Sequence, residues 1–283
     1  MDILSGKKIA SAILVELKNK ISAKKLHPVL GVILVGSDEA SKIYVKLKGE
    51  AAEKIGIGFQ KIELATDISE QELLAVIANF NSNDKINGII VQLPLPEHLD
   101  KLKIIQAIDP KKDVDGFHSE NIALFFAGRE RFSPVFPNAL LELLKSVETH
   151  NDASLQDKKA VIICNSQEFG KTMQIALKKE NVVSQYFFRA DIQENLDNIK
   201  NADIIITACG VPNLISGEML NEGVIIIDGG ITRVGDKVVG DVDFESVQNL
   251  SGYLSPVPGG VGPVTIACLL WNVYLAIKNP SIK

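Results

Sequence analysis

Short runs of β-branched and other apolar residues alternate with helix-like segments along the first part of the chain. The apolar runs cover 29–36, 58–65 and 86–93, and helical patterns at 38–56 and 69–82 separate them. Strands that alternate with helices in this way indicate a mostly parallel sheet with right-handed crossover connections. The pattern therefore assigns the chain to the α/β class.

A second alternation follows, after further helical patterns near 99–108 and 138–148. Its expected strands are 159–164, 182–188, 203–209 and 223–228, the series of a Rossmann-like unit. We therefore expect two domains that flank a cleft. The N-terminal domain would cover 1–118 and be joined by the closing helix at 264–283, and the Rossmann-like domain would cover 119–263, with the boundary in the region 118–138.

Composition narrows the class of partner. The chain has 283 residues, of which 46% are hydrophobic, enough to fill two cores. A net charge of -5 with scattered lysine pairs predicts no binding to nucleic acid or to an anionic membrane. Cys164, Cys209 and Cys268 are widely spaced and form no CxxC motif, so we predict neither disulfides nor a metal site. A reducing cytoplasm fits these cysteines.

Neither end of the chain has the pattern of an export or membrane segment. Residues 1–20 interrupt their apolar positions with Lys7, Lys8 and Glu16 at helical spacing, which is typical of an amphipathic helix. The longest apolar segment, 264–277, contains Asn272 and is shorter than the roughly 20 residues of a membrane span. We therefore predict no membrane segment.

The segment 38–56 carries a lysine on its apolar side when it is wound as a helix. Lys48 shares a face with Tyr44 and Ile55, whereas Lys46 falls on the opposite face. A lysine among apolar residues loses hydration of its ammonium form, so its pKa falls toward values useful for proton transfer. The alternative is that Lys48 extends to the surface.

Two later segments supply polar groups where ligands bind in α/β proteins. Gln92 stands at the carboxyl end of a buried strand, the edge at which open α/β sheets bind ligands. Asp113 and Asp115 lie in a turn whose Gly116 tolerates a positive φ, and a carboxylate there can bind paired N–H donors of a heterocycle. His118 follows directly without a visible partner, and we interpret it as a turn residue.

The segment 255–265, SPVPGGVGPVT, gathers three prolines and three glycines into a rigid loop. Backbone without side chains, as at Gly259 and Gly260, can approach a ligand closely. Taken singly, this loop and the preceding motifs are more typical of turns than of a binding site.

Together the motifs are distinctive. YVKLK, VQLPLP, KDVDGF, GDVDF and PVPGGVGPVT occur in this order, and across essentially the whole chain the sequence resembles the bifunctional methylenetetrahydrofolate dehydrogenase/methenyltetrahydrofolate cyclohydrolase family, the FolD type. The resemblance implies an N-terminal folate-binding domain, a C-terminal NAD(P)-binding Rossmann domain and a homodimer. It implies NADP-dependent oxidation of 5,10-methylenetetrahydrofolate to 5,10-methenyltetrahydrofolate and hydrolysis of that product to 10-formyltetrahydrofolate, with NAD as the other candidate nucleotide.

The resemblance also implies roles for individual residues. Lys48 would be the catalytic lysine, Tyr44 its neighbour that stacks on the folate, Gln92 the partner that tunes the lysine and Asp115 the anchor of the pterin ring. The expected substrate-binding residues are Tyr44, Gln92, Leu93, Pro94, Asp115, Pro256, Gly259 and Gly260. A neutral Lys48 can accept a proton from the water that attacks the cationic methenyl carbon, whereas an ammonium group there would repel that carbon.

The cofactor half departs from the family pattern. Where relatives usually read GRSxxVGxP, this chain has CNSQEFGKT at 164–172, so the first glycine and the arginine are missing. We expect the Cys164 side chain to take up space near the pyrophosphate and weaken binding, and Arg189 to replace the missing arginine at the 2′-phosphate. Asp191 is the alternative contact, to the free ribose hydroxyl of NAD. The expected cofactor-binding residues are Cys164, Asn165, Ser166, Gly170, Arg189, Gly210 and Ile231.

Three interpretations follow. The first is a bifunctional enzyme with an altered cofactor site, and the second is a cyclohydrolase whose dehydrogenase activity is weakened or lost. The third is a folate-binding protein without catalysis, which the intact lysine and aspartate motifs argue against. The sequence does not separate the first two interpretations, nor NADP from NAD.

Overall fold

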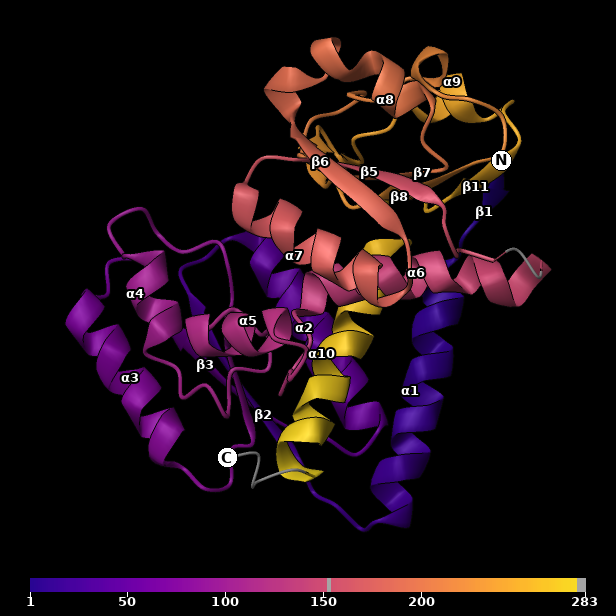
Figure 1. Cartoon of the computed structure of the whole chain (residues 1–283). Helices are drawn as coiled ribbons and strands as arrows, with labels where there is room; N and C mark the ends of the chain where they lie inside the picture. The colour runs from indigo at the N-terminus through magenta and orange to yellow at the C-terminus, as the bar shows by residue number, and fades with distance from the viewer. Residues whose placement is uncertain (152–153, 279–283) are drawn as a thin grey trace. The chain divides into compact units, whose positions relative to one another are not determined.

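The computed structural model describes residues 1–151 and 154–278. The chain divides into two compact units (Figure 1). Unit 1 consists of Met1–Ala10 and Phe136–Thr265, and unit 2 consists of Ser11–Val135 with the chain from Ile266 onward. Residues 279–283 of the expected closing helix lie outside the described residues.

Unit 2 is built on a three-stranded parallel sheet in the order β3-β2-β4. Its strands are β2 (Val29–Val35), β3 (Gly58–Leu64) and β4 (Gly88–Val91). Its helices are α2 (Glu39–Lys54), α3 (Glu70–Ser82), α4 (Lys101–Gln106) and α5 (Ser119–Phe126), together with most of α1 (Gly6–Ala23) and α10 (Val261–Lys278). The predicted strands and the helices α2 to α4 are confirmed to within a few residues at each end.

Helices cover both faces of this sheet, as a βαβ series requires. Gly31 on β2 lies against the Phe80 ring of α3, whereas Gly88 on β4 lies against Val273 of α10. Ser69 begins α3 with the predicted capping box, since its side chain and that of Glu72 bond each other's backbone N–H groups.

Unit 1 contains a six-stranded parallel sheet in the order β1-β11-β8-β7-β5-β6. The strands are β1 (Asp2–Ile3), β5 (Lys159–Cys164), β6 (Val183–Phe188), β7 (Ile204–Ala208), β8 (Val224–Asp228) and β11 (Gly252–Leu254). The helices are α6 (Val135–Asn151), α7 (Gln167–Lys179), α8 (Leu196–Lys200) and α9 (Phe244–Val247), and β9 (Thr232–Val234) pairs with β10 (Lys237–Val239) in a short antiparallel hairpin. The parallel Rossmann-like series is confirmed.

Several elements differ from the sequence-based expectation. The chain begins with strand β1, which pairs with β11 at the edge of the sheet, and α1 starts only at Gly6. The unit boundary falls at 135/136 rather than at 118/119, because α5 and the segment after it bond to the turn around Asp113 and Asp115 in unit 2. The closing helix belongs, from Ile266 onward, to unit 2, together with Ser11–Val135.

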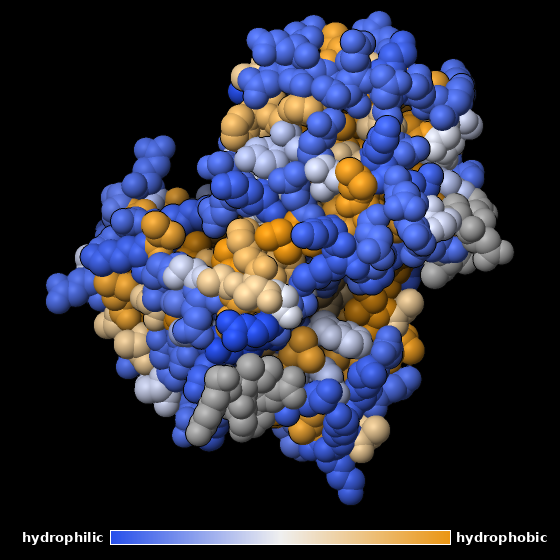
Figure 2. Space-filling view, viewed as in Figure 1, coloured by the Kyte–Doolittle hydropathy of each residue, from blue (hydrophilic) through white to orange (hydrophobic). Residues whose placement is uncertain are grey.

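The helix α10 explains the most apolar stretch of the sequence. By length and composition alone it could cross a membrane, and it is the one such helix in the described ranges 1–151 and 154–278. More than half of it, 56%, is buried inside the protein, and Asn272 bonds the carbonyl oxygens of Val114 and Ser133. Burial in a core accounts for the same composition. On the face drawn in Figure 2, hydrophilic residues predominate and hydrophobic residues form smaller groups.

Each of the two parallel sheets has one point at which the strand order reverses. In unit 2, β3 and β4 lie on opposite sides of β2, and in unit 1, β6 and β7 lie on opposite sides of β5. Open α/β sheets bind ligands at the carboxyl ends of the strands beside such a reversal. These edges carry Gln92 after β4, and Cys164 and Cys209 at the ends of β5 and β7.

Candidate active site

Lys48 and Gln92 meet at the strand-order reversal of unit 2. Lys48 is on α2, whose start is fixed by Asp38, since the Asp38 carboxylate accepts a bond from Ser41 N at 2.7 Å. Gln92 follows β4, and its backbone N–H bonds Ile33 O at 2.9 Å. Lys48 Nζ donates to Gln92 Oε1 at 2.8 Å. Lys48 therefore does not extend into solvent.

The Gln92 amide has a defined orientation. Its Nε2 donates to the Leu93 carbonyl oxygen at 2.6 Å, which leaves Oε1 for the lysine. An uncharged acceptor holds the lysine without the strong preference for the ammonium form that a carboxylate in the same place would create.

Burial lowers the pKa of Lys48, and the negative charge of Asp115 partly opposes that shift. At a given pH, a larger fraction of Lys48 is therefore neutral than of an ordinary lysine, and the neutral amine is the form that can accept a proton from water. Tyr44, one helical turn earlier, is half-buried, and burial raises the pKa of its phenol. The Tyr44 ring is neutral near pH 7 and offers a flat surface beside the lysine.

Asp115 lies in the turn between α4 and α5. Burial raises the pKa of its carboxyl group to about 6, Lys48 lowers it and Asp113 raises it further. Gly116 follows with φ of 76°, as the predicted turn requires. The carboxylate is thus coupled electrostatically to the lysine and is largely ionised near pH 7.

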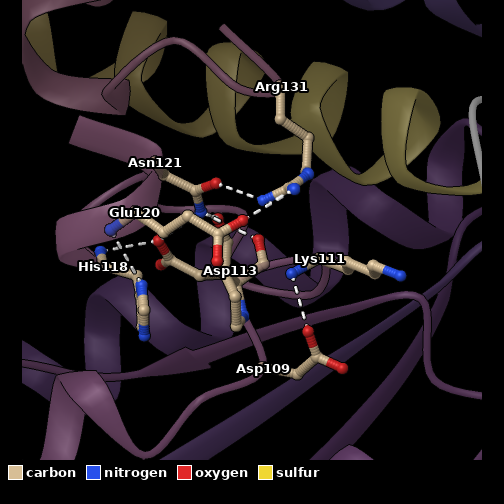
Figure 3. Close-up of polar contacts among 8 residues, drawn as sticks. Asp109, Lys111, Asp113, His118, Glu120, Asn121 and Arg131 are labelled. Atoms are coloured by element: carbon tan, nitrogen blue, oxygen red, sulfur yellow. Dashed lines mark hydrogen bonds and ion pairs between the residues drawn. The ribbon is translucent and has the colours of Figure 1, made fainter. Parts of the chain in front are cut away.

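The neighbouring Asp113 builds the turn rather than facing a ligand (Figure 3). Its carboxylate is buried and accepts hydrogen bonds from Gly116 N, His118 N and the Asn121 side chain. His118 begins α5, and its Nδ1 accepts a bond from Glu120 N at 3.1 Å, so the structure uses it as the turn residue that we predicted.

Leu93 and Pro94 line a pocket directly after Gln92. The other lining residues are Leu95, Pro96, Glu97, Leu99 and Lys101. The pocket is mostly apolar with two charged side chains. Its position next to Gln92 agrees with the predicted substrate-binding role of Leu93 and Pro94, which stays a prediction.

In unit 1, the turn after β5 differs from its expected form. The Cys164 side chain is fully buried, with Sγ 3.3 Å from Ser166 O, so the thiol points into the protein. Asn165 Nδ2 donates to Cys209 O at 2.7 Å and ties the turn to the loop after β7. Ser166 begins α7, since its Oγ accepts a bond from Phe169 N.

Gly170 is a packing residue in this structure. A Cβ there would lie 2.6 Å from the Tyr186 ring, so the missing side chain lets α7 approach β6 closely. Arg189 follows β6 in a short 3₁₀ helix and is exposed, as a residue that reaches a ribose phosphate must be.

Two buried aspartates shape the other loops of unit 1. Asp241 accepts hydrogen bonds from Thr207 Oγ1, Cys209 N and Val211 N at 2.6–2.7 Å, and thereby holds the loop that contains Gly210. Asp228 accepts bonds from Gly230 N, Asp241 N and Val242 N, and burial raises the pKa of its carboxyl group to about 6. Gly210 and Ile231 are exposed beside these anchored segments.

The remaining predicted residues, Pro256, Gly259 and Gly260, also belong to unit 1. Gly260 N bonds Pro256 O at 2.7 Å, which closes the loop between β11 and α10. A Cβ at Gly6 would overlap Gly260 O, so the start of α1 packs on this loop. Their contact with folate stays a prediction.

Some functional side chains were not predicted from the sequence. Asn121, Arg131 and Asn272 support the Asp115 turn, and Asp228 and Asp241 support the loops of unit 1. Of these five residues, only Asp241 lies in one of the motifs named in the sequence analysis, GDVDF. Among the described residues, no group of three or more His, Cys, Asp or Glu could hold a metal ion.

Comparisons with known proteins assign a family model to each of two parts of the chain. Residues 4–115 match the family model "Tetrahydrofolate dehydrogenase/cyclohydrolase, catalytic domain", and residues 134–281 match its "NAD(P)-binding domain". The bifunctional protein FolD of Nautilia profundicola is 42% identical over 283 residues, which cover 99% of this chain and 98% of the relative. FolD of Oceanobacillus iheyensis is 43% identical over 282 residues, covering 98% and 97%.

Solved structures give the same result. The bifunctional enzyme FolD of Campylobacter jejuni superposes with a TM-score of 0.91 at 41% identity and 99% coverage of both chains. FolD of Trypanosoma brucei, solved with NADP and an inhibitor, superposes with a TM-score of 0.92 at 29% identity, covering 99% of this chain and 98% of that one. This chain therefore belongs to the tetrahydrofolate dehydrogenase/cyclohydrolase family.

Proposed function

We propose that this chain is a bifunctional enzyme of one-carbon folate metabolism. It oxidises 5,10-methylenetetrahydrofolate to 5,10-methenyltetrahydrofolate with NADP and hydrolyses the product to 10-formyltetrahydrofolate. The observation that carries the proposal is the 2.8 Å bond from Lys48 Nζ to Gln92 Oε1 at the strand-order reversal of the unit that matches the catalytic domain.

Lys48 serves the hydrolytic step. The methenyl carbon is cationic, and its attack by water releases a proton. A lysine with a lowered pKa, held by the neutral Gln92, accepts that proton and afterwards assists opening of the ring. An ammonium group at the same place would instead repel the cation.

Asp115, Tyr44 and the loop after Gln92 bind and orient the folate. The Asp115 carboxylate accepts bonds from N–H donors of the pterin ring, and the Tyr44 ring stacks on it. Leu93 and Pro94 line the adjoining pocket. Pro256, Gly259 and Gly260 complete the proposed substrate contacts.

The loops of unit 1 suit a nicotinamide dinucleotide. Gly210 is exposed with φ of 65° on a loop anchored by Asp241, and Ser166 begins α7 beside it at the strand-order reversal. We assign Asn165, Ser166, Gly210 and Ile231 to the nucleotide and Arg189 to its 2′-phosphate. When bound, the nicotinamide accepts the hydride from the methylene carbon of the folate.

A cyclohydrolase with little dehydrogenase activity is the second candidate. One observation favours it. Asn165 stands where relatives usually carry an arginine, and its side chain is tied to Cys209 O, so it does not supply the missing positive charge. Glu168, in the first turn of α7, adds negative charge next to the same turn.

We also propose a homodimer in the cytoplasm. The full-length family resemblance supports the homodimer, and three buried free cysteines fit a reducing compartment. Light scattering on the purified chain tests the first part, since a dimer should have twice the mass of the chain.

An assay of both half-reactions with each nucleotide tests the main proposal. We expect oxidation of methylenetetrahydrofolate with NADP and hydrolysis of methenyltetrahydrofolate without nucleotide. Hydrolysis with no oxidation by either NADP or NAD would establish the second candidate instead.

A further inference from the structure

A buried line of hydrogen bonds lies beneath the turn that carries Asp115. Arg131 Nη1 donates to Asn121 Oδ1 at 2.8 Å, and Asn121 Nδ2 donates to Asp113 Oδ2 at 2.9 Å. Figure 3 shows the three side chains joined in this order. Asn121 and Asp113 are 0% and 1% exposed, and the Arg131 side chain is 9% exposed. We call these three residues the Asn121 network.

An amide is the side chain that fits between these two neighbours. Arg131 offers only donors, so it requires an acceptor, and the Asp113 carboxylate offers only acceptors, so it requires a donor. Asn121 supplies both, and its Nδ2 also bonds Pro110 O at 2.8 Å. The partners therefore fix which end of the amide faces which neighbour.

The network controls the backbone on both sides of Asp115. The Asp113 carboxylate accepts bonds from Gly116 N at 3.2 Å and His118 N at 2.8 Å. Asp115 O in turn accepts a bond from Val135 N at 3.1 Å. Because Asp113 is two residues before Asp115 and Gly116 is directly after it, a shift of the Asp113 carboxylate would move the Asp115 side chain.

Arg131 supplies the positive charge of the network. Its Nη2 bonds Glu120 Oε1 at 2.8 Å, and Glu120 is half exposed. Arg131 Nε is buried without a hydrogen-bond partner among the described residues. An unsatisfied buried donor is unfavourable, so the guanidinium is held there by its contacts with Asn121 and Glu120. Through the Asn121 amide, it orients a donor toward the buried Asp113 carboxylate.

We propose that Asn121 is a positioning residue for the folate-binding carboxylate of Asp115, and that Arg131 acts through Asn121. The inference rests on the proposed function, because it takes Asp115 as the folate anchor. It adds two residues, neither of which faces the substrate, to those that set substrate affinity.

The test is Asn121→Asp, which keeps the shape of the side chain. At pH 8 the new carboxylate faces Asp113, with Arg131, Glu120 and His118 as the other charged or titratable groups nearby. It repels Asp113 and has no donor, so KM for methenyltetrahydrofolate should rise about tenfold or more while kcat changes less. Initial rates are measured after subtraction of the uncatalysed hydrolysis.

Lowering the pH distinguishes positioning from loss of folding. Lowering the pH from 8 toward 6 favours uptake of a proton by the two facing carboxyl groups, because each disfavours ionisation of the other. The protonated carboxyl group that Asn121→Asp introduces can then donate to Asp113 as the amide does. The ratio of the variant KM to the parent KM should therefore fall toward one. Asn121→Ala cannot gain a donor, and its KM ratio should stay high at both pH values.

Asn79→Asp is the matched control, because it makes the same change at an exposed position of α3. Its KM should equal that of the parent at both pH values. Nucleotide binding and the melting temperature report whether each variant is folded. A folded Asn121→Asp whose KM equals the parent's at pH 8, or whose KM ratio does not fall at pH 6, would overturn the inference.

If Asn121→Asp does not fold, variants of Arg131 test the same positioning role of the Asn121 network. Arg131→Met should raise KM several-fold, and Arg131→Lys should raise it less, because lysine keeps the charge and one donor. An unchanged KM in folded Arg131→Met would overturn the inference. Failure of the parent itself to hydrolyse methenyltetrahydrofolate would instead refute the proposed function.

Discussion

At the residue scale, differences in burial and in charged neighbours give two nearby aspartates different roles. Asp113 is fully buried and accepts its hydrogen bonds from the turn and from Asn121 of α5, whereas Asp115 is half-buried and coupled to Lys48. The sequence KDVDGF presents both as equivalent carboxylates. Their different partners are what make one structural and the other available to a ligand.

The pKa of Asp115, raised by burial to about 6, predicts a pH dependence of substrate binding. The carboxylate is protonated as the pH falls through 6, so KM for methenyltetrahydrofolate should rise below that pH. Asp115→Asn should have a high KM with no such rise, while nucleotide affinity is unchanged. Steady-state rates from pH 5 to 8 and calorimetry with each ligand provide the measurement.

The raised pKa of Asp115 also predicts how this carboxyl group affects the stability of the fold at different pH values. When folding raises the pKa of a carboxyl group, that group stabilises the folded protein at pH values below its pKa in the unfolded chain. This contribution of Asp115 is lost as the pH rises through about 6, the pKa in the folded protein. Asp115→Asn should therefore melt at a temperature no lower than the parent at pH 8. A lower melting temperature at pH 8 would mean that the ionised carboxylate stabilises the fold, contrary to this account.

Arg189 gives a third prediction at this scale. If it binds the 2′-phosphate, Arg189→Ala should lower the ratio of kcat/KM for NADP over that for NAD about tenfold, the effect of one charge-assisted hydrogen bond. Arg233→Ala, at an exposed arginine of the β9–β10 hairpin, is the control. An unchanged ratio in Arg189→Ala would exclude Arg189 as the anchor of the phosphate.

At the element scale, buried carboxylates hold the loops that follow the strands. Asp241 is 34 residues from Thr207 in the sequence. Its carboxylate nevertheless accepts hydrogen bonds from the Thr207 hydroxyl group and from two backbone N–H groups of the loop after β7. Such a residue determines the shape of the loop after β7 without facing a ligand.

Asp241→Asn tests this role. An amide offers one acceptor oxygen and turns its NH₂ group toward a donor, so the loop around Gly210 should move. KM for the nucleotide should rise about tenfold or more, whereas hydrolysis of methenyltetrahydrofolate without nucleotide should be unchanged. The control is Asp243→Asn at the start of α9, where asparagine caps a helix as well as aspartate does. Equal nucleotide KM values for parent and Asp241→Asn would contradict the role.

Patterns within one element were predictable from the sequence, and contacts between distant elements were not. The apolar runs predicted β2, β3 and β4 of unit 2 and β5 to β8 of unit 1, but neither β1 nor β11. Helical spacing placed Lys48 on the face of Tyr44. The strand β1 has two residues, too few for a pattern, and is defined by pairing with β11. Asn121 has no signal of its own, because its role arises only when folding brings Asp113 and Arg131 to its two ends. The burial of the Cys164 thiol likewise depends on how the turn after β5 closes.

At the scale of the whole molecule, two binding functions are assigned to two compact units of one chain. Lys48, Gln92 and Asp115 belong to unit 2, and the nucleotide loops belong to unit 1. The chain passes between the units within α1, beside the start of α6 and within α10. We therefore expect that the hydrolytic step can be removed without loss of nucleotide binding.

The measurement that tests this claim most directly is hydrolysis of methenyltetrahydrofolate by Lys48→Met. The variant keeps the length of the side chain and removes the amine, so the rate should fall at least about 100-fold, as for a lost acid/base group, with nucleotide affinity unchanged. Lys46→Met, at a side chain that is 77% exposed on the same helix, should hydrolyse at the parent rate. Near-parent hydrolysis by folded Lys48→Met would contradict the account.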